Sequence, residues 1–121
     1  MEWNIRADRP VYLQLLEQLE AAVASGAYAP GERLPGVREL AAQAGVNPNT
    51  MQRALAELET RGLVRTQRTA GRTVTDDAQA IASARRALAM RSAREFLAAA
   101  HALGLTNEEA AELLAAAIRE E

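Results

Sequence analysis

A chain of 121 residues, 49% of them hydrophobic, is long enough to bury the core of one small domain with an appendage. The absence of cysteine excludes disulfides and thiolate chemistry, and the lack of a signal-peptide order or an apolar run of transmembrane length predicts a cytoplasmic protein with no membrane partner. The formal net charge of −2 taken alone argues against a polyanionic partner.

The first third of the chain predicts one amphipathic helix between a short strand and a loop. Trp3–Ile5 are expected to form the strand and Pro10–Ser25 the helix, since proline suits a first helical position and Gly26 suits an end. Hydrophobic residues recur every four positions on one helix face, at Val11, Leu15, Leu19 and Val23. Glycine and proline then punctuate residues 26–36, which predicts a loop.

Two shorter helices separated by a tight turn are predicted next. Val37–Ala44 are expected to form the first, with Gly45 ending it in the left-handed conformation. Asn47 and Pro48 suit the cap and the first position of the second helix, which should stop at Gly62. Its buried face is expected to consist of Met51, Ala54, Leu55 and Leu58.

A β-hairpin should follow these helices. The sequence is rich in valine and threonine at Leu63–Gln67 and Arg72–Thr75, which predicts two strands with Thr69–Gly71 as the tip between them. Two short helices joined by a glycine turn and followed by a two-stranded ribbon have the plan of a winged helix-turn-helix. In that plan the second helix shows polar side chains to the major groove of DNA while its apolar back fixes its angle.

The remaining sequence is alanine-rich and helical in period. Residues 78–102 predict one helix, and Thr106 with Glu109 fit a capping box at the start of another. We therefore expect a mainly α fold with a small β-wing. Residues 1–76 would form the winged helix-turn-helix domain, and residues 77–121 a short helical region.

The charges of the chain are unevenly distributed. Residues 33–75 carry seven arginines against three acidic residues, whereas residues 1–32 and 76–121 each have a net charge of −3. A basic centre between acidic ends is what phosphate binding by one segment requires. Chance clustering of arginines on a solvated face is the alternative.

This central segment resembles the GntR family of bacterial regulators. Pro30–Ala41 is similar to the family's motif around the first short helix, and Gly45–Leu55 is similar to its recognition helix. Further matches are Pro10–Tyr12 with Gln14, Leu58–Glu59, Gly62–Val64, Gly71 and Val74. The resemblance covers roughly residues 8–75 and implies a DNA-binding transcriptional regulator, most often a repressor.

The resemblance also implies the residues that contact DNA. Arg38 falls where the family has an arginine that reaches DNA, often at a guanine edge, although an ion pair with Glu39 is the alternative for a surface arginine. The exposed front of the recognition helix would present Asn47, Asn49, Thr50, Gln52 and Arg53. Of these, Gln52 and Arg53 are expected to read bases and Thr50 to touch phosphate, while Asn47 is equally a helix cap.

The wing contributes Gly71 and Arg72, which would approach the minor groove. The sequence differs from the family's usual residues at three positions. Gly36 replaces a serine able to cap a helix or bond phosphate, Thr69 replaces a wing glycine, and Thr73 replaces an aromatic residue.

The C-terminal region resembles the YtrA-like branch of the family, which ends in a few short helices. The 46 residues after position 75 are too few for an effector-binding or catalytic domain. Two amphipathic helices would leave an exposed apolar stripe that a second copy buries, although packing back onto the chain's own domain is the alternative. The expected dimer interface consists of Ile81, Leu88, Leu97, Leu113, Leu114 and Ile118.

Together these features predict a sequence-specific regulator, a repressor that binds a pseudo-palindromic operator in double-stranded DNA as a homodimer. A protein-interaction module on the same winged-helix scaffold is the alternative, and the salt dependence of DNA binding separates the two. We do not expect an enzyme, because one histidine and no cysteine leave no nucleophile–base set. No metal or cofactor is expected, and a small-molecule effector is left open.

Overall fold

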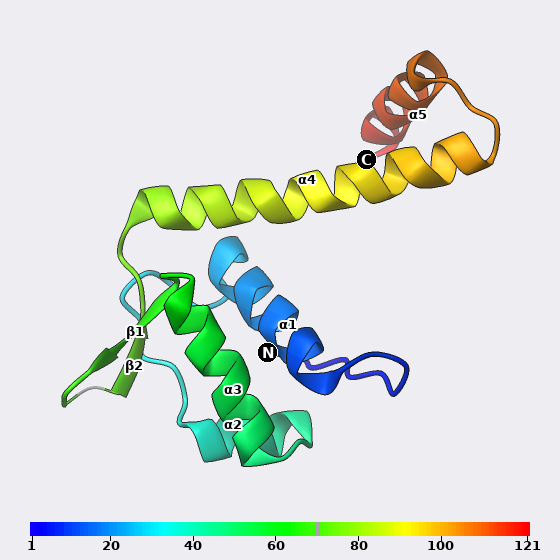
Figure 1. The fold of residues 1–121 in the computed structure, drawn as a ribbon. Helices are drawn as coiled ribbons and strands as arrows, with labels where there is room; N and C mark the ends of the chain where they lie inside the picture. Colours follow the sequence, from blue (N-terminus) through cyan, green and yellow to red (C-terminus); the bar gives the residue numbers. More distant parts are fainter. Residues whose placement is uncertain (70) are drawn as a thin grey trace. The chain divides into compact units, whose positions relative to one another are not determined.

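The computed structural model describes residues 1–69 and 71–121, and its contacts divide the chain into two units, Met1–Arg85 and Arg86–Glu121. The elements in chain order are α1 (Val11–Ser25), α2 (Val37–Ala44), α3 (Pro48–Thr60), β1 (Val64–Gln67), β2 (Gly71–Val74), α4 (Ala78–Ala102) and α5 (Asn107–Glu120) (Figure 1). This order confirms the expected mainly helical fold with a two-stranded wing. None of the described helices is long and apolar enough to span a bilayer.

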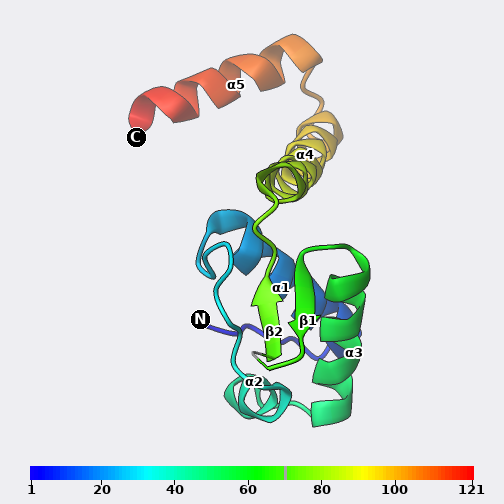
Figure 2. The ribbon, with the colours of Figure 1, turned by 90° about the vertical axis from the view of Figure 1, so that its left-hand side faces the viewer.

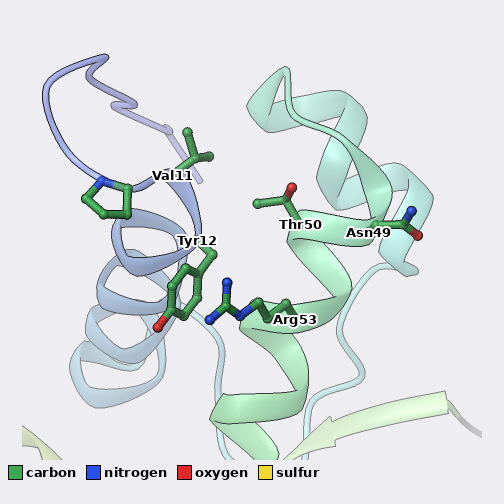
Figure 3. A pocket seen from close by; sticks show the side chains of 6 residues that line it. Val11, Tyr12, Asn49, Thr50 and Arg53 are labelled. Atoms are coloured by element: carbon green, nitrogen blue, oxygen red, sulfur yellow. The ribbon is translucent and has the colours of Figure 1, made fainter.

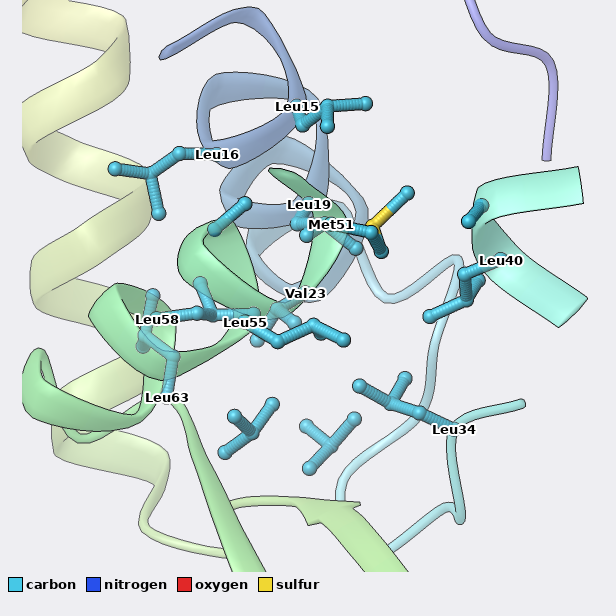
Figure 4. Close-up of a cluster of buried hydrophobic side chains, with 14 of the residues drawn as sticks. Leu15, Leu16, Leu19, Val23, Leu34, Leu40, Met51, Leu55, Leu58 and Leu63 are labelled. Atoms are coloured by element: carbon cyan, nitrogen blue, oxygen red, sulfur yellow. The ribbon is translucent and has the colours of Figure 1, made fainter. Parts of the chain in front are cut away.

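One hydrophobic core holds the first unit together (Figure 4). α1 and α2 both pack against α3, so the apolar back of α3 lies at the centre of the unit. The buried face predicted for α3 is confirmed, because Met51, Ala54, Leu55 and Leu58 are at most 1% exposed. At the far end of α3, Arg61 pairs with the buried Glu20 of α1, which ties the two helices together.

The strand predicted at Trp3–Ile5 is wrong, because this segment is held by side chains and not by a β-ladder. The Gln14 amide accepts from the Arg6 N–H and donates to the Arg6 carbonyl, both at 2.7 Å. Gln18 makes the same two-way contact with Asn4, at 3.0 and 2.8 Å. Two glutamines one turn apart on α1 therefore satisfy the backbone groups that a neighbouring strand would otherwise have paired.

The turn between α2 and α3 forms as the sequence indicates. Gly45 has a φ of 71°, and its N–H closes the end of α2 in the left-handed conformation that favours glycine. The Asn47 side chain then caps α3 by accepting the Asn49 N–H at 2.8 Å, with Pro48 in the first helical turn. Both helix boundaries are thereby fixed within a few residues.

The wing consists of β1 and β2 in antiparallel register, with Val64 opposite Val74 and Gln67 opposite Gly71. The strand bounds differ by one residue from those expected, since β1 starts after Leu63 and β2 starts at Gly71. At the expected hairpin tip, Ala70 lies outside the described residues. The segment before α2 covers the other edge of β2, because the Leu34 N–H donates to the Arg72 carbonyl at 2.9 Å. Figure 2 shows β1 beside α3.

α4 starts in the first unit and continues into the second. Its Ile81 belongs to the first unit's core and is 6% exposed, and the Arg85 guanidinium donates to the Ala24 carbonyl of α1 at 2.9 Å. Ile81 is therefore a core residue with little surface left for the dimer contact expected of it. The expected domain boundary between residues 76 and 77 remains a prediction.

The second unit is a helical pair with a small core. Its buried side chains are two alanines, Ala100 and Ala110, and the capping box predicted for Thr106 and Glu109 is present at the start of α5. Gly104, with a φ of 85°, turns the chain between the helices. The lone histidine, His101, is used locally, since its Nε2 lies 2.6 Å from Oδ1 of Asn107.

Candidate nucleic-acid interface

The outer face of α3 is polar and open to solvent. The structure places Asn47, Asn49, Gln52 and Arg53 in exposed positions and Thr50 in a half-buried one, all on the side opposite the core. The predicted residues of the recognition helix are thus brought together on one surface. Their backbone cannot rotate, because the leucines and the methionine behind them are fully packed.

At the N-terminus of α3, side chains are available to a ligand but the first backbone N–H groups are not. Pro48 has no N–H, the Asn49 N–H is held by the Asn47 side chain, and the Thr50 N–H donates to the Asn47 carbonyl at 3.0 Å. Any phosphate bound at this end would therefore be held by hydroxyl, amide or guanidinium groups. Asn47 acts as a cap and retains its side-chain N–H₂ as a possible donor.

The first turn of α2 lies on the same unit and carries Arg38. Gly36 provides no side-chain cap for this helix, so the position where the family has a serine leaves the first amides of α2 without that partner. Arg38 is exposed, and within the described part of the chain it forms no ion pair, with Glu39 or any other acid. The N–H groups of its guanidinium are therefore available to a ligand.

Arg53 is held by an aromatic ring. Its guanidinium carbon lies 3.6 Å from the centroid of the Tyr12 ring, across a shallow cleft of about 430 Å³ between the start of α1 and α3. Figure 3 shows the two side chains pointing toward each other, with Thr50 and Asn49 on the turn above. The cleft is lined by Pro10, Val11, Tyr12, Asn49, Thr50 and Arg53.

Of the two wing residues expected to approach DNA, Gly71 is exposed to solvent and Arg72 is turned toward the protein. Gly71 is exposed with a φ of 73°, a conformation that favours glycine. Arg72 has a side chain only 19% exposed, and its Nε lies 3.6 Å from the Glu59 carboxylate of α3. Its guanidinium therefore points back toward the protein's own acid in this structure.

Two further arginines flank the wing. Arg33 lies beside Gly71, since a Cβ at that glycine would be 3.6 Å from the arginine Nε, and Arg68 is exposed near the end of the hairpin. Their charge is part of the basic segment 33–75, but no sequence motif marked either of them as a DNA contact. The signal for Arg33 was its place beside the Leu34–Pro35 motif, but only the pairing of that segment with β2 brings it to the wing.

No grouping suited to a metal ion accompanies this surface, because within residues 1–69 and 71–121 no three His, Asp or Glu side chains converge. The arrangement that remains is an apolar-backed polar helix with arginines on both sides. The family described as "Bacterial regulatory proteins, gntR family" matches residues 11–74. The chain belongs to this family.

The similarity to known regulators extends beyond the winged helix in one of two relatives compared. YhcF of Bacillus subtilis (strain 168), an uncharacterized HTH-type transcriptional regulator, is 35% identical over 109 residues, which cover 90% of each chain. YtrA of the same organism, an HTH-type transcriptional repressor, is 38% identical over 74 residues, 61% of this chain and 57% of that protein.

A solved structure shows the same architecture over nearly the full length. The GntR family transcriptional regulator from Listeria monocytogenes superposes with a TM-score of 0.83 at 30% identity, covering 97% of this chain and 99% of its own. The structural similarity therefore includes the two helices after the wing. This gntR-family chain is an HTH-type transcriptional regulator of the YtrA-like kind, and such regulators are not enzymes.

Proposed function

We propose that this regulator is a repressor that binds a pseudo-palindromic operator in double-stranded DNA as a homodimer. The observation that carries the proposal is the two-sided construction of α3, whose back is at most 1% exposed while its front is polar and open. A helix fixed in this way can enter the major groove at a set angle. The relative named as a repressor, YtrA, supports repression as the outcome.

Each residue of the surface has a role in this proposal. Arg38, Gln52 and Arg53 reach base edges, since a guanidinium fork suits the O6 and N7 acceptors of guanine and a carboxamide suits adenine. Thr50 contacts phosphate, and Asn47 and Asn49 contribute amide donors at the start of α3. Gly71 lets the wing backbone approach the minor groove, and Arg72 would join it only where its pairing with Glu59 is broken.

The ion pairs decide how many arginines are left for DNA. In residues 33–75, Arg61, Arg65 and Arg72 pair with acids of the chain itself. The others form no ion pair within the described residues, namely Arg33, Arg38, Arg53 and Arg68. With Arg38 and Arg53 at base edges, Arg33 and Arg68 are left for phosphate, and these two contacts per protomer would give a dimer a slope of about −4 in log K against log salt concentration.

The second unit supplies the dimer contact in this proposal. Several of its large apolar side chains are left on the surface, with Leu97 38%, Leu113 50%, Leu114 45% and Ile118 68% exposed. Around Leu97 and Leu114 lies an apolar groove of about 220 Å³, lined also by Ala93, Phe96, Asn107, Ala110 and Ala111. Pairing with a second copy would remove these leucines from water and set two α3 helices for two half-sites. Leu88 is half-buried and would lie nearer the edge of this contact.

Selection of bound duplexes from a random pool, followed by fluorescence anisotropy on the selected sequence, tests the proposal. We expect two half-sites related by a two-fold axis and an affinity that falls steeply with salt. A protein that ignores duplex DNA at low ionic strength would refute the proposal and favour a protein-interaction module. Asymmetric sites bound by one protomer would refute the dimer alone. As a DNA-binding repressor the protein would act in the cytoplasm.

A further inference from the structure

Tyr12 is the aromatic side chain that stands against the DNA-facing surface of α3. It lies in the first turn of α1, is half-buried, and its ring is 3.6 Å from the guanidinium carbon of Arg53 (Figure 3). The two residues are 41 positions apart in sequence and meet only because α1 packs against α3. Tyr12 is not among the side chains that form the hydrophobic core or pack against it.

The stacked geometry fixes the arginine without consuming its donors. A guanidinium lying over a ring face is attracted by the ring quadrupole, while all five of its N–H groups lie in the guanidinium plane and remain free for acceptors. Within the described residues Arg53 forms no ion pair, in contrast to Arg61, which donates to carboxylates of the chain, and to Arg72, whose Nε lies 3.6 Å from the Glu59 carboxylate. Arg53 is therefore held in one orientation while its N–H groups remain free to donate to a base.

We propose that Tyr12 is a specificity-determining residue that acts through Arg53, holding its guanidinium in the plane needed to read two adjacent acceptors such as O6 and N7 of guanine. The inference rests on the proposed DNA-binding function. Tyr12 is a positioning residue in this scheme, because it touches the arginine and the arginine touches the base. Because the ring already orders the Arg53 side chain in the free protein, Arg53 loses less conformational entropy when it binds DNA.

The size of the effect follows from that lost freedom. Immobilising a long side chain on binding weakens affinity by about three- to ten-fold, so removing the ring should cost about that much on the preferred operator. On an operator changed at the base pair that Arg53 reads, the cost should vanish. A merely structural tyrosine would weaken both complexes equally.

The experiment compares the full chain with Tyr12→Leu, Tyr12→Phe, Arg53→Ala and the double variant Tyr12→Leu/Arg53→Ala. Anisotropy is measured on the selected operator and on a set changed one base pair at a time. We expect Arg53→Ala to remove the preference at one base pair of each half-site and Tyr12→Leu to weaken that same preference. Tyr12→Phe should retain it, and the double variant should bind no worse than Arg53→Ala.

A spectroscopic signature reports the contact in the free protein. The ring should shift the Arg53 side-chain proton resonances upfield, and this shift should persist in Tyr12→Phe and disappear in Tyr12→Leu. Tyr12→Met, which is flexible and of similar bulk, replaces the leucine variant if thermal melting shows that leucine unfolds the chain. Arg38→Ala serves as the control, because its effect should add to that of Tyr12→Leu.

Three outcomes would overturn the inference while leaving the proposed function standing. These are a uniform loss over all operators in the non-aromatic variants, additivity of the Tyr12 and Arg53 effects, or tighter specific binding once the ring is gone. Failure of the wild-type chain to distinguish any duplex would instead refute the proposed function, and the inference with it.

Discussion

Glu59 on α3 and Arg72 on β2 form a polar link between the recognition helix and the wing. The Glu59 Oε1 lies 3.6 Å from the Arg72 Nε and also accepts the Thr66 hydroxyl of β1 at 2.8 Å. One carboxylate therefore contacts both strands of the hairpin. It also neutralises an arginine that the proposed interface would use, so the wing is fixed at the cost of one positive charge.

Replacing Glu59 by glutamine should release that charge. The variant keeps an acceptor for Thr66 but loses the attraction for Arg72, so the affinity for duplex DNA should rise and the salt slope should steepen by about 1 per protomer. Stability should change little, by less than about 1 kcal/mol, because the Glu59 side chain is 38% exposed and such pairs are screened by solvent.

Anisotropy titrations over a range of salt concentrations check this prediction. Glu59→Gln/Arg72→Ala is the matched control, in which the slope should return to or below that of the wild type. An unchanged slope in the single variant would show that Arg72 does not reach phosphate even when it is freed.

Arg38→Ala should weaken specific operator binding by about 1–3 kcal/mol and relax the preference at one base pair. The arginine is exposed and forms no ion pair within the described residues, so its removal breaks nothing inside the protein. Arg86→Ala, at another exposed arginine on α4, is the matched control and should leave the operator preference intact. Equal footprints and affinities for Arg38→Ala and the wild type would exclude a role for Arg38.

The sequence was informative where structure depends on local chemistry. Helix bounds follow from caps and glycines. The Asn47 side chain accepts a backbone N–H in the first turn of α3, and Gly45 adopts the left-handed conformation that ends α2. The apolar back of α3 follows from its period. The outer residues of α3 could be named in advance for the same reason.

The sequence did not indicate the contacts that join distant segments. The Tyr12–Arg53 stack and the Glu59–Arg72 pair depend on how helices and strands cross, which no local pattern encodes. The N-terminal arm was misjudged because alternating hydrophobic residues predict a strand, whereas glutamine side chains supply the pairing here. Ile81 looked like an interface residue because a helical stripe does not reveal which of two cores it enters.

The apolar surface of the second unit gives a prediction on oligomeric state. Leu113→Glu/Ile118→Glu places two carboxylates in the proposed dimer contact, where desolvation of unpaired charges is costly. We expect a monomer in sedimentation equilibrium and a large loss of operator affinity, with an unchanged helical content. Truncation after Thr75 is a poorer test, because it also removes Ile81 from the first unit's core and the Arg85 contact with Ala24.

Ala115→Glu is the matched control for this pair. At 100° per residue it lies outside the helical stripe formed by Leu113, Leu114 and Ile118, so it adds a carboxylate to the same helix without entering the contact. A dimer that survives the double substitution would place the interface elsewhere on the chain.

Gln14 gives a stability prediction that separates the arm from the interface. Its amide is 3% exposed and makes three hydrogen bonds, to the Arg6 N–H and to the carbonyls of Arg6 and Arg9. Gln14→Ala would leave these part-buried backbone groups without partners, so the free energy of unfolding should fall by about 1–3 kcal/mol. Urea denaturation followed by the fluorescence of Trp3, which lies in the same arm, measures the loss.

Gln18→Ala, whose bonds to Asn4 are exposed to water, is the control and should lower the free energy of unfolding by less than half as much. Equal losses in the two variants would mean that burial of the Gln14 pairing does not stabilise the fold.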